Sequence, residues 1–302
     1  MVMTKKLKIY SLQDFISLDI PQKSFIVDPF LPERGLIEIY AKPGVGKTTF
    51  ALSLGMAVAL GSPFLKWNAP KPKQVLYIDG EMPPSDMQER ARATAQYFGV
   101  DALEVENFKI LNRDMNNGQL PDIGETSGQR EFDIATNNAD LIILDNLSAL
   151  RFTGKENEAD SWSIIQRWLL EMRGRGKTVI ILHHAGKDGT SRGTSRRHDI
   201  LDTVIKLQRP SDYLQSEGAV FELHFEKCRG FFGDAAEPVG LSYTIIDGIS
   251  HWECFAISDE TMEEVVSLTN QGLRQTEIAS KMGISQPKVS KLLKSAKEKG
   301  LI

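Results

Sequence analysis

The chain has few cysteines. Only two of its 302 residues are cysteine, Cys228 and Cys254, and they are isolated from one another. Two isolated thiols form neither a disulfide framework nor a metal cluster, so the composition suits a reducing compartment. We expect both cysteines to be buried in strands, because their neighbours are apolar.

Segments that would enter a membrane are also missing. No apolar run approaches the ~18 residues that a transmembrane helix needs. The basic start of the chain, residues 1–8, is not followed by a signal-type hydrophobic stretch. We therefore expect a soluble cytoplasmic protein without membrane contact.

An excess of basic charge is absent as well. The net charge is −4, from 36 Lys and Arg against 40 Asp and Glu. The chain is thus not a uniformly basic nucleic-acid binder, and any contact with DNA must come from local patches. Its length is enough to bury a full α/β core with room for a small extra module.

What the chain does have is a glycine-rich loop between a strand pattern and a helix pattern. The loop is Ala-Lys-Pro-Gly-Val-Gly-Lys-Thr-Thr over residues 41–49, with an apolar run at 36–40 and an Ala/Leu-rich run at 50–60. Strand, glycine loop and helix form the context of a P-loop, although Ala41 stands where the pattern usually has glycine. A surface loop rich in Gly and Pro is the simpler alternative, but it does not account for the Lys-Thr pair.

The P-loop predicts a site for ATP and Mg²⁺. Glycines let backbone N–H groups turn toward phosphate oxygens at the positive end of a helix. Lys47 would reach the β- and γ-phosphates, and the Thr48 hydroxyl would ligate Mg²⁺. The predicted nucleotide-binding residues are Lys42, Pro43, Gly44, Val45, Gly46, Lys47, Thr48 and Thr49.

Two further apolar runs end in acidic residues. The run 74–78 leads to Asp79 and Glu81, and the run 141–144 leads to Asp145. Ligands of open α/β sheets bind at the carboxyl ends of strands, so Asp145 is predicted to hold the magnesium. Glu81 is the candidate base for the attacking water, and the alternative is an N-cap acid for a helix over 85–97.

The next buried strand, 178–182, ends in His183 and His184. Adjacent strand residues point to opposite faces, so one metal site cannot easily use both. A γ-phosphate sensor is the better interpretation for one of them. The basic loop that follows is a candidate contact for a nucleic-acid backbone, and a solvated surface loop is the alternative. Its cations are Lys187, Arg192, Arg196 and Arg197.

The remaining core is predicted to contain more strands and three helices. Lys227 and Arg229 take alternate positions near a strand end, where they could meet phosphates across a subunit boundary. We expect helices at 85–97, 130–138 and 160–173 after polar loops, and strands at 107–111, 202–207, 220–225, 238–246 and 251–255.

A composition break near Ser258 introduces three helix patterns. They cover 261–268, 275–282 and 286–299, which predicts a small all-α helix-turn-helix domain. The last helix has an apolar stripe opposite a row of lysines, so it could bind double-stranded DNA. A module for protein contacts only is the alternative. The candidate DNA contacts are Ser285, Gln286, Lys288, Ser290 and Lys291.

At the other end, residues 1–30 suggest a short helix and an extended arm. Their apolar residues follow no long period, so the arm should pack either on a neighbouring subunit or on its own domain. The predicted domains are this arm, an ATPase domain over 31–257 and the helix-turn-helix domain over 258–302.

The ordered motifs from about residue 25 to 255 resemble the RecA-like hexameric helicases. They are most similar to the RepA-like branch, which replicates plasmids and other mobile elements. The resemblance implies an α/β RecA-like P-loop core, mostly parallel with an antiparallel edge hairpin. It places the catalytic base on Glu81 in Ile-Asp-Gly-Glu-Met-Pro, the Walker-B acid on Asp145, and the phosphate sensor on His184 in Leu-His-His-Ala.

The same resemblance extends to the DNA channel and the subunit interface. Residues 191–195 look like the channel-facing segment of that family. Lys227 and Arg229 match a Lys-x-Arg pair that related helicases insert into the neighbour's ATP site, which makes Arg229 the arginine finger. Arg196 or Arg197 could serve instead.

The function implied by the resemblance is a ring-forming, hexameric, DNA-stimulated ATPase. It would be a replicative-type DNA helicase that hydrolyses ATP with Mg²⁺ between subunits and moves on single-stranded DNA. Two alternatives stay open. One is a recombinase or helicase-loader ATPase that does not unwind DNA, and the other is an ATP-regulated DNA-binding regulator that acts through the helix-turn-helix.

Overall fold

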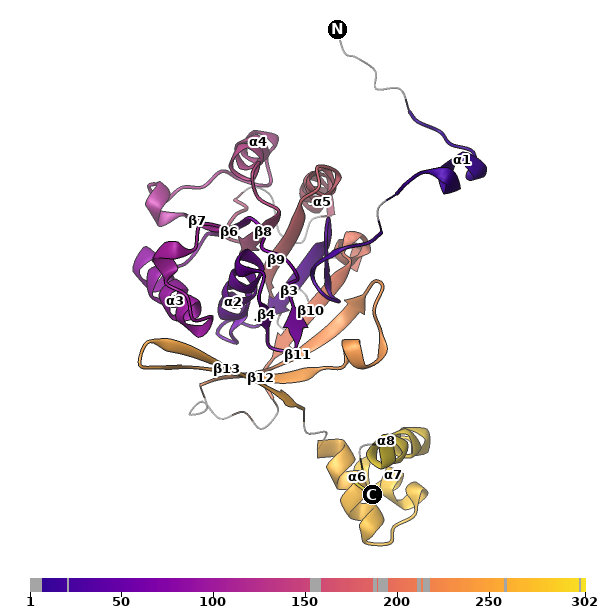
Figure 1. The fold of residues 1–302 in the computed structure, drawn as a ribbon. Helices are drawn as coiled ribbons and strands as arrows, with labels where there is room; N and C mark the ends of the chain where they lie inside the picture. The colour runs from indigo at the N-terminus through magenta and orange to yellow at the C-terminus, as the bar shows by residue number, and fades with distance from the viewer. Residues whose placement is uncertain are drawn as a thin grey trace.

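A computed structural model describes residues 7–20, 22–152, 159–186, 189, 195–210, 213, 218–257, 260–298 and 300–302. For 159–161, 195–197, 260–261, 288, 291, 295 and 298 the description covers the backbone only. One nine-stranded sheet organises the core, in the order β13-β12-β11-β10-β3-β9-β8-β6-β7 (Figure 1). Its strands are β3 (Leu36–Ala41), β6 (Val75–Asp79), β7 (Phe108–Asn112), β8 (Leu141–Asp145), β9 (Thr178–His184), β10 (Thr203–Gln208), β11 (Ala219–Cys228), β12 (Val239–Ile246) and β13 (Ile249–Ala256).

The strands from β10 to β7 run parallel, and β11, β12 and β13 continue the sheet in antiparallel pairs. This arrangement confirms the predicted α/β class with a mostly parallel sheet. Every residue of β3, β6 and β8 is buried. Parallel strands covered on both faces show unbroken apolar runs, which is why these three strands were predictable.

Helices cover both faces of the sheet. α2 (Lys47–Leu60) packs in one apolar cluster with Ile37 and Ile39, whereas α4 (Thr126–Ala135) and α5 (Ala159–Gly174) pack in another with Leu36 and Tyr40. Odd and even residues of β3 thus point to opposite faces. A Cβ added to Gly55 would lie 2.9 Å from the Ile143 and Phe108 side chains, so α2 approaches the sheet closely there.

Shorter elements complete the core. A fourth helix, α3 (Pro84–Tyr97), contacts α2 and β13. The small strands are β1 (Phe25–Val27), β2 (Leu31–Pro32), β4 (Pro63–Phe64) and β5 (Trp67–Asn68), and the 3-10 helices are η1 (Ala102–Glu104), η2 (Asp114–Asn116), η3 (Ser195–Ile200) and η5 (Gly233–Ala236).

Two local expectations were wrong. The helix predicted at 130–138 begins earlier, at Thr126, because Gly128 belongs to its first turn rather than to a loop. A Cβ at Gly128 would lie 2.2 Å from the Asp122 carbonyl oxygen, so only glycine lets this turn pack there. Cys254 is exposed rather than buried, since β13 is the edge strand of the sheet, and Cys228 is half-buried.

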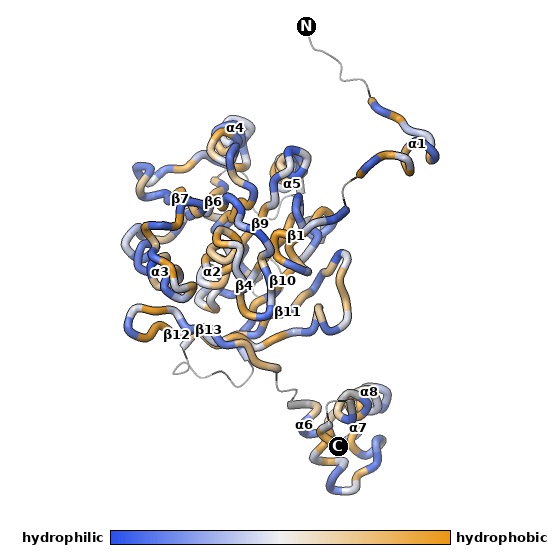
Figure 2. Tube along the Cα trace, viewed as in Figure 1, coloured by the Kyte–Doolittle hydropathy of each residue, from blue (hydrophilic) through white to orange (hydrophobic). Residues whose placement is uncertain are grey.

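The start of the described chain stands away from the sheet. α1 (Leu12–Ser17) buries none of its residues, and Figure 1 shows it at the end of an extended arm. Hydrophobic and hydrophilic residues alternate along this arm in Figure 2. Packing on its own domain begins only at β1, where Ile26 and Val27 are buried. The large apolar side chains exposed on the arm are Leu7, Ile9, Tyr10, Leu12, Phe15, Ile16, Leu18 and Ile20.

Three helices at the C-terminus form a separate bundle beyond β12 and β13 in Figure 1. They are α6 (Glu260–Asn270), α7 (Gln275–Met282) and α8 (Gln286–Glu298). The bundle has its own small core, built on Val265, Ile278 and Val289. Gly283 ends α7 with φ 64°, a left-handed conformation that glycine adopts without strain. Among the described residues, none of the helices combines the length and apolar character that a membrane crossing requires.

Candidate nucleotide site

The glycine loop lies between β3 and the first turn of α2. Gly44 and Gly46 have φ 77° and 128°, in the region that favours glycine. A Cβ at Gly46 would lie 2.7 Å from the Phe221 ring, so a larger residue there would displace the loop from β11. At Gly44 nothing lies within 4 Å of such a Cβ, so the space beside this glycine is open. Together with the N-terminus of α2, the loop forms a cradle for an anion.

Lys47, Thr48 and Asp145 meet at this cradle. The Thr48 hydroxyl donates a hydrogen bond to Asp145 Oδ2 over 2.7 Å, and Lys47 Nζ lies 4.0 Å from Asp145 Oδ1. Lys47 and Asp145 are both buried. A hydroxyl beside a carboxylate is a set of oxygen donors that fits Mg²⁺, which would bring its remaining ligands from water and phosphate.

Glu81 lies across the same edge of the sheet. Its Oε1 is 3.9 Å from His184 Nε2 at the end of β9, which is longer than a hydrogen bond. Asn146, which follows β8, lies 3.0 Å from the same His184 nitrogen through its Nδ2. The pKa of Glu81 is lowered to about 2, mainly by His184 and then by Asn146 and the charge of Lys47. Together these groups outweigh partial burial, which raises the pKa. The carboxylate is therefore ionised at neutral pH.

A hydrogen-bonded turn fixes the position of Glu81. Asp79 Oδ1 accepts from the backbone N–H groups of Glu81 and Met82 over 3.3 and 3.2 Å, and Asn112 Nδ2 donates to Asp79 Oδ2 over 2.6 Å. Burial raises the pKa of Asp79, and it outweighs these hydrogen bonds, which lower it. The helix α3 starts at Pro84 after Pro83, with no side-chain cap, so the alternative of Glu81 as an N-cap acid is wrong.

The two histidines face different environments. His183 is completely buried, whereas His184 has 22% of its side chain exposed and faces Glu81. The alternation along β9 thus separates them. Within the described part of the chain, no three His, Cys, Asp or Glu side chains gather into a metal-binding group.

Sequence reasoning missed three side chains of this region. Arg209 Nη2 donates to the carbonyl oxygen of Gly44 over 2.9 Å, and Arg90 Nη1 lies 3.4 Å from Thr49 Oγ1. Tyr77 donates its hydroxyl proton to Asp145 over 2.6 Å. Arg209 follows β10, the sheet neighbour of β3, and that position at the carboxyl end was the available signal.

Lys227 and Arg229 lie at the amino ends of the parallel strands, and the P-loop lies at their carboxyl ends. β11 passes Gly46 near its start, at Phe221, and ends beside Thr203, which pairs with Ile37 near the start of β3. Lys227 Nζ donates to the His198 carbonyl oxygen, and Arg229 Nη2 donates to that of Asp199 over 2.7 Å. Burial, and then the charge of Arg229, lower the pKa of Lys227. A single chain therefore does not bring this pair to its own nucleotide site.

The candidate DNA contacts are only partly described. Lys187 and Arg192 lie outside the described residues, and the structure gives only the backbone of Arg196 and Arg197, in η3. For Lys288 and Lys291 the side chains also lie outside the description. Ser285, Gln286 and Ser290 are exposed at the leading end of α8, where Gln286 Nε2 donates to Gln275 Oε1 over 2.8 Å.

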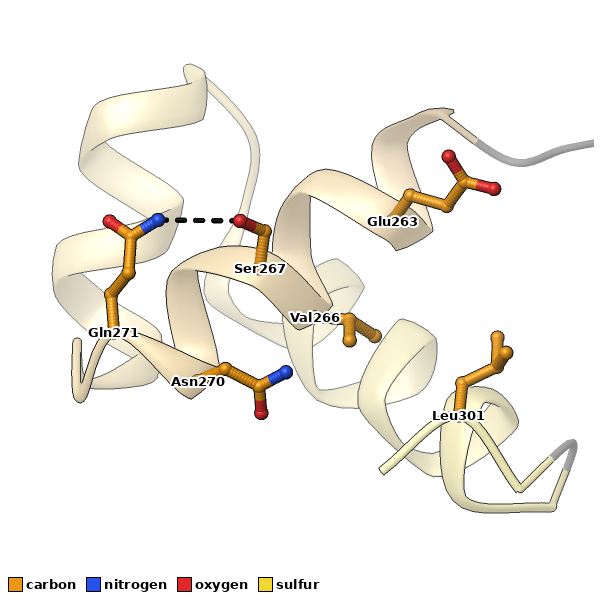
Figure 3. Close-up of a pocket in the computed structure, with 6 residues that line it drawn as sticks. All are labelled: Glu263, Val266, Ser267, Asn270, Gln271 and Leu301. Carbon is orange, nitrogen blue, oxygen red and sulfur yellow. Dashed lines mark hydrogen bonds between the residues drawn. The ribbon is translucent and has the colours of Figure 1, made fainter.

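A hollow in the C-terminal bundle lies away from this chemistry. It is open and lined by the outer face of α6 and by Leu301 (Figure 3). Among the described residues that line it, Glu263 is the only one with an ionisable side chain, and Gln271 Nε2 donates to Ser267 Oγ over 3.3 Å. The described lining therefore contains no acid–base pair for catalysis.

The contact between His184 and Glu81 gives a measurable expectation. A His184→Gln protein should show a pKa for Glu81 that rises from about 2 toward its usual 4.5, because the main group favouring the carboxylate is gone. As the pH falls, the Glu81 carboxylate of this variant would therefore be protonated at a higher pH than in the parent. A carboxyl ¹³C titration by NMR measures the shift. The control is His224→Gln, which breaks a different contact between a glutamate and a histidine, on β11. It should leave the pKa of Glu81 unchanged. An unmoved Glu81 in His184→Gln would contradict the assignment of the cause.

Comparison with known proteins gives a matching family and similar solved structures. The model of a family described as an AAA domain matches residues 5–190, which include the P-loop, Glu81, Asp145 and His184. The KaiC-like protein PH0186 from the hyperthermophilic archaeon Pyrococcus horikoshii OT3 is similar in structure, with a TM-score of 0.50 and 19% identity over 76% of this chain and 93% of that chain. At this identity the likeness shows the fold alone, that of the P-loop core.

Proposed function

The chain belongs to the AAA domain family of ATPases, and from this premise we propose a ring-forming, DNA-stimulated ATPase of the replicative-helicase type. The observation that carries the proposal is the convergence of Thr48, Asp145, Glu81 and His184 at one edge of the sheet. Lys47 would contact the β- and γ-phosphates, while Thr48 and Asp145 would hold Mg²⁺. Glu81 would orient the attacking water and accept its proton.

A second copy of the chain would complete each site. Lys227 and Arg229 lie near the amino end of β3, whereas the P-loop of the same chain follows the carboxyl end of that strand. Inserted into a neighbour, Arg229 would act as the arginine finger, with Arg196 or Arg197 as the alternatives, and such a finger is worth about 10³ to 10⁵ in rate. The exposed apolar arm over residues 7–20 supports self-association, since it has no cover in its own chain within the described residues.

Nucleotide state would be coupled to DNA through β9. His184 ends this strand beside Glu81 and Asn146, and the basic loop begins three residues later. Loss of the γ-phosphate would release His184 and shift the loop that carries Lys187 and Arg192 along single-stranded DNA. η3 anchors the far end of that loop, because Lys227 and Arg229 bind carbonyl groups of this short helix.

The C-terminal bundle supports a second contact with DNA, and also a second candidate function. It has its own core, and Lys281, Lys294 and Lys297 are exposed on it. In the helicase proposal it would hold double-stranded DNA near the ring. In the alternative, the bundle would be the only DNA-binding part, and nucleotide would set the oligomeric state of a regulator.

ATPase activity with and without single-stranded DNA tests the proposal, with particle mass recorded in the same samples. We expect an oligomer whose hydrolysis rises several-fold when the oligonucleotide is added. A chain shortened by residues 258–302 should keep both single-strand binding and the stimulation. Loss of all DNA binding on this truncation would favour the regulator. Forked-duplex unwinding by the full chain separates a helicase from a loader or recombinase.

A further inference from the structure

The Tyr77 side chain in the middle of β6 is completely buried and directed at the metal side of the site. Its hydroxyl donates to Asp145 Oδ2 over 2.6 Å. The same oxygen accepts the Thr48 hydroxyl proton over 2.7 Å. One carboxylate oxygen thus receives two donors from two different elements, β6 and α2.

The Tyr77 ring has little freedom to move. It stacks on Phe108, with 6.3 Å between ring centroids and 30° between planes. In the sheet ladder Tyr77 lies between Ile110 and Ile143. Between a tyrosine hydroxyl and a carboxylate oxygen, the hydroxyl is the donor.

This donor determines which way the Asp145 carboxylate turns. A carboxylate has about four sites that can accept hydrogen bonds or bind a metal, two on each oxygen. Tyr77 and Thr48 fill those of Oδ2, so Oδ1 turns toward Lys47 and the P-loop, with Lys47 Nζ at 4.0 Å. Without the Tyr77 hydroxyl, rotation about Cβ–Cγ could bring Asp145 into a direct ion pair with Lys47.

We propose that Tyr77 is a positioning residue for the Mg²⁺ site, which holds Asp145 with Oδ1 presented to the metal and its water ligands. The inference rests on the proposed function in one respect, namely that Asp145 is the metal-side acid. Partners of metal-ligand side chains commonly contribute about 10- to 100-fold to metal affinity. A phenylalanine would fill the same space in the core, so the hydroxyl itself accounts for the effect.

Calorimetric titration of Mg²⁺ into the full-length protein with bound ADP tests the inference. For Tyr77→Phe we expect Mg²⁺ binding about 10-fold weaker, and ADP binding without Mg²⁺ within about twofold of the parent. Tyr243→Phe is the matched control. It also loses a tyrosine hydroxyl bond, to Ser250 Oγ at 3.0 Å, but outside the site, so its Mg²⁺ affinity should not change.

Asp145→Asn separates failure of this inference from failure of the proposed site. Unchanged Mg²⁺ affinity in Asp145→Asn would overturn the metal site itself. Weaker binding in Asp145→Asn with unchanged binding in Tyr77→Phe would leave Tyr77 as a core residue only. Fluorine NMR of the parent protein labelled with 3-fluorotyrosine requires no variant. The Tyr77 signal should move when Mg²⁺ is added and the Tyr243 signal should not, and a Tyr77 signal that stays in place would overturn the proposal.

Discussion

An Arg229→Ala protein is expected to lose about 10³-fold or more in ATP turnover while it still binds ATP and folds normally. The proposed cation stabilises charge that develops on the transferred phosphoryl group, so its loss affects the reaction far more than binding. Arg229 is exposed and its Nη2 bonds only a backbone carbonyl, that of Asp199, among the described residues, so stability should change little. The rate of phosphate release at saturating ATP measures the effect.

Mixing two inactive proteins shows whether Arg229 acts on a neighbour. In a random equal mixture with Glu81→Gln, about one quarter of the interfaces would join an intact Glu81 to an intact Arg229, so activity should return in part. Arg175→Ala, which removes another exposed arginine far from these residues in the sequence, should keep full activity. No recovery in the mixture would contradict an interfacial site. Full activity of the Arg229→Ala protein by itself would indicate that Arg196 or Arg197 is the arginine finger instead.

The sequence allowed the centre of the fold to be predicted because the central strands are buried on both faces. β3, β6 and β8 are continuous apolar runs that end in the P-loop, in Asp79 and in Asp145, and their bounds were predicted to within one residue. Chemistry at the carboxyl ends of such strands then follows from the geometry of any parallel sheet. For that reason Glu81 and His184 could be placed on the same edge before the structure.

The contacts between strands that are not consecutive could not be predicted. Tyr77 reaches Asp145 because β6 pairs with β8, and Arg209 reaches Gly44 because β10 pairs with β3. Strand order is a property of the whole fold, and a tyrosine in an apolar run resembles any other core residue. Only the sheet order shows that its hydroxyl lies at a carboxylate.

The ends of the chain were less predictable for another reason. An apolar arm gives the same pattern whether it covers its own domain or another molecule, and both alternatives fitted residues 7–20. The structure leaves Leu7, Ile9 and Leu12 exposed and buries Ile26, so within the described residues the arm does not pack on its own domain. A second copy of the chain, which the proposed function needs for another reason, is the partner that we propose for the arm.

A Glu81→Gln protein is expected to hydrolyse ATP about 10²- to 10⁴-fold more slowly than the parent while it binds ATP with unchanged affinity. The amide keeps the size of the side chain but cannot accept the proton of the attacking water. Glu81 is more than half exposed, and the turn that positions it is formed by Asp79 and backbone N–H groups, so the fold should not change. Single-turnover hydrolysis and fluorescent-nucleotide binding measure the two quantities separately.

Lys47→Ala is the contrasting variant for this experiment. Lys47 lies at the start of α2 beside the phosphate cradle, so its loss should weaken nucleotide binding as well as hydrolysis. Glu81→Gln should instead retain ATP and stay in the assembled, DNA-bound state, because the step that follows binding is blocked. Full hydrolysis by Glu81→Gln would show that another carboxylate is the base. Asp79 would then be the next candidate, because it lies two residues away and burial raises its pKa. Loss of ATP affinity in Glu81→Gln would show instead that the residue binds the nucleotide rather than activating water.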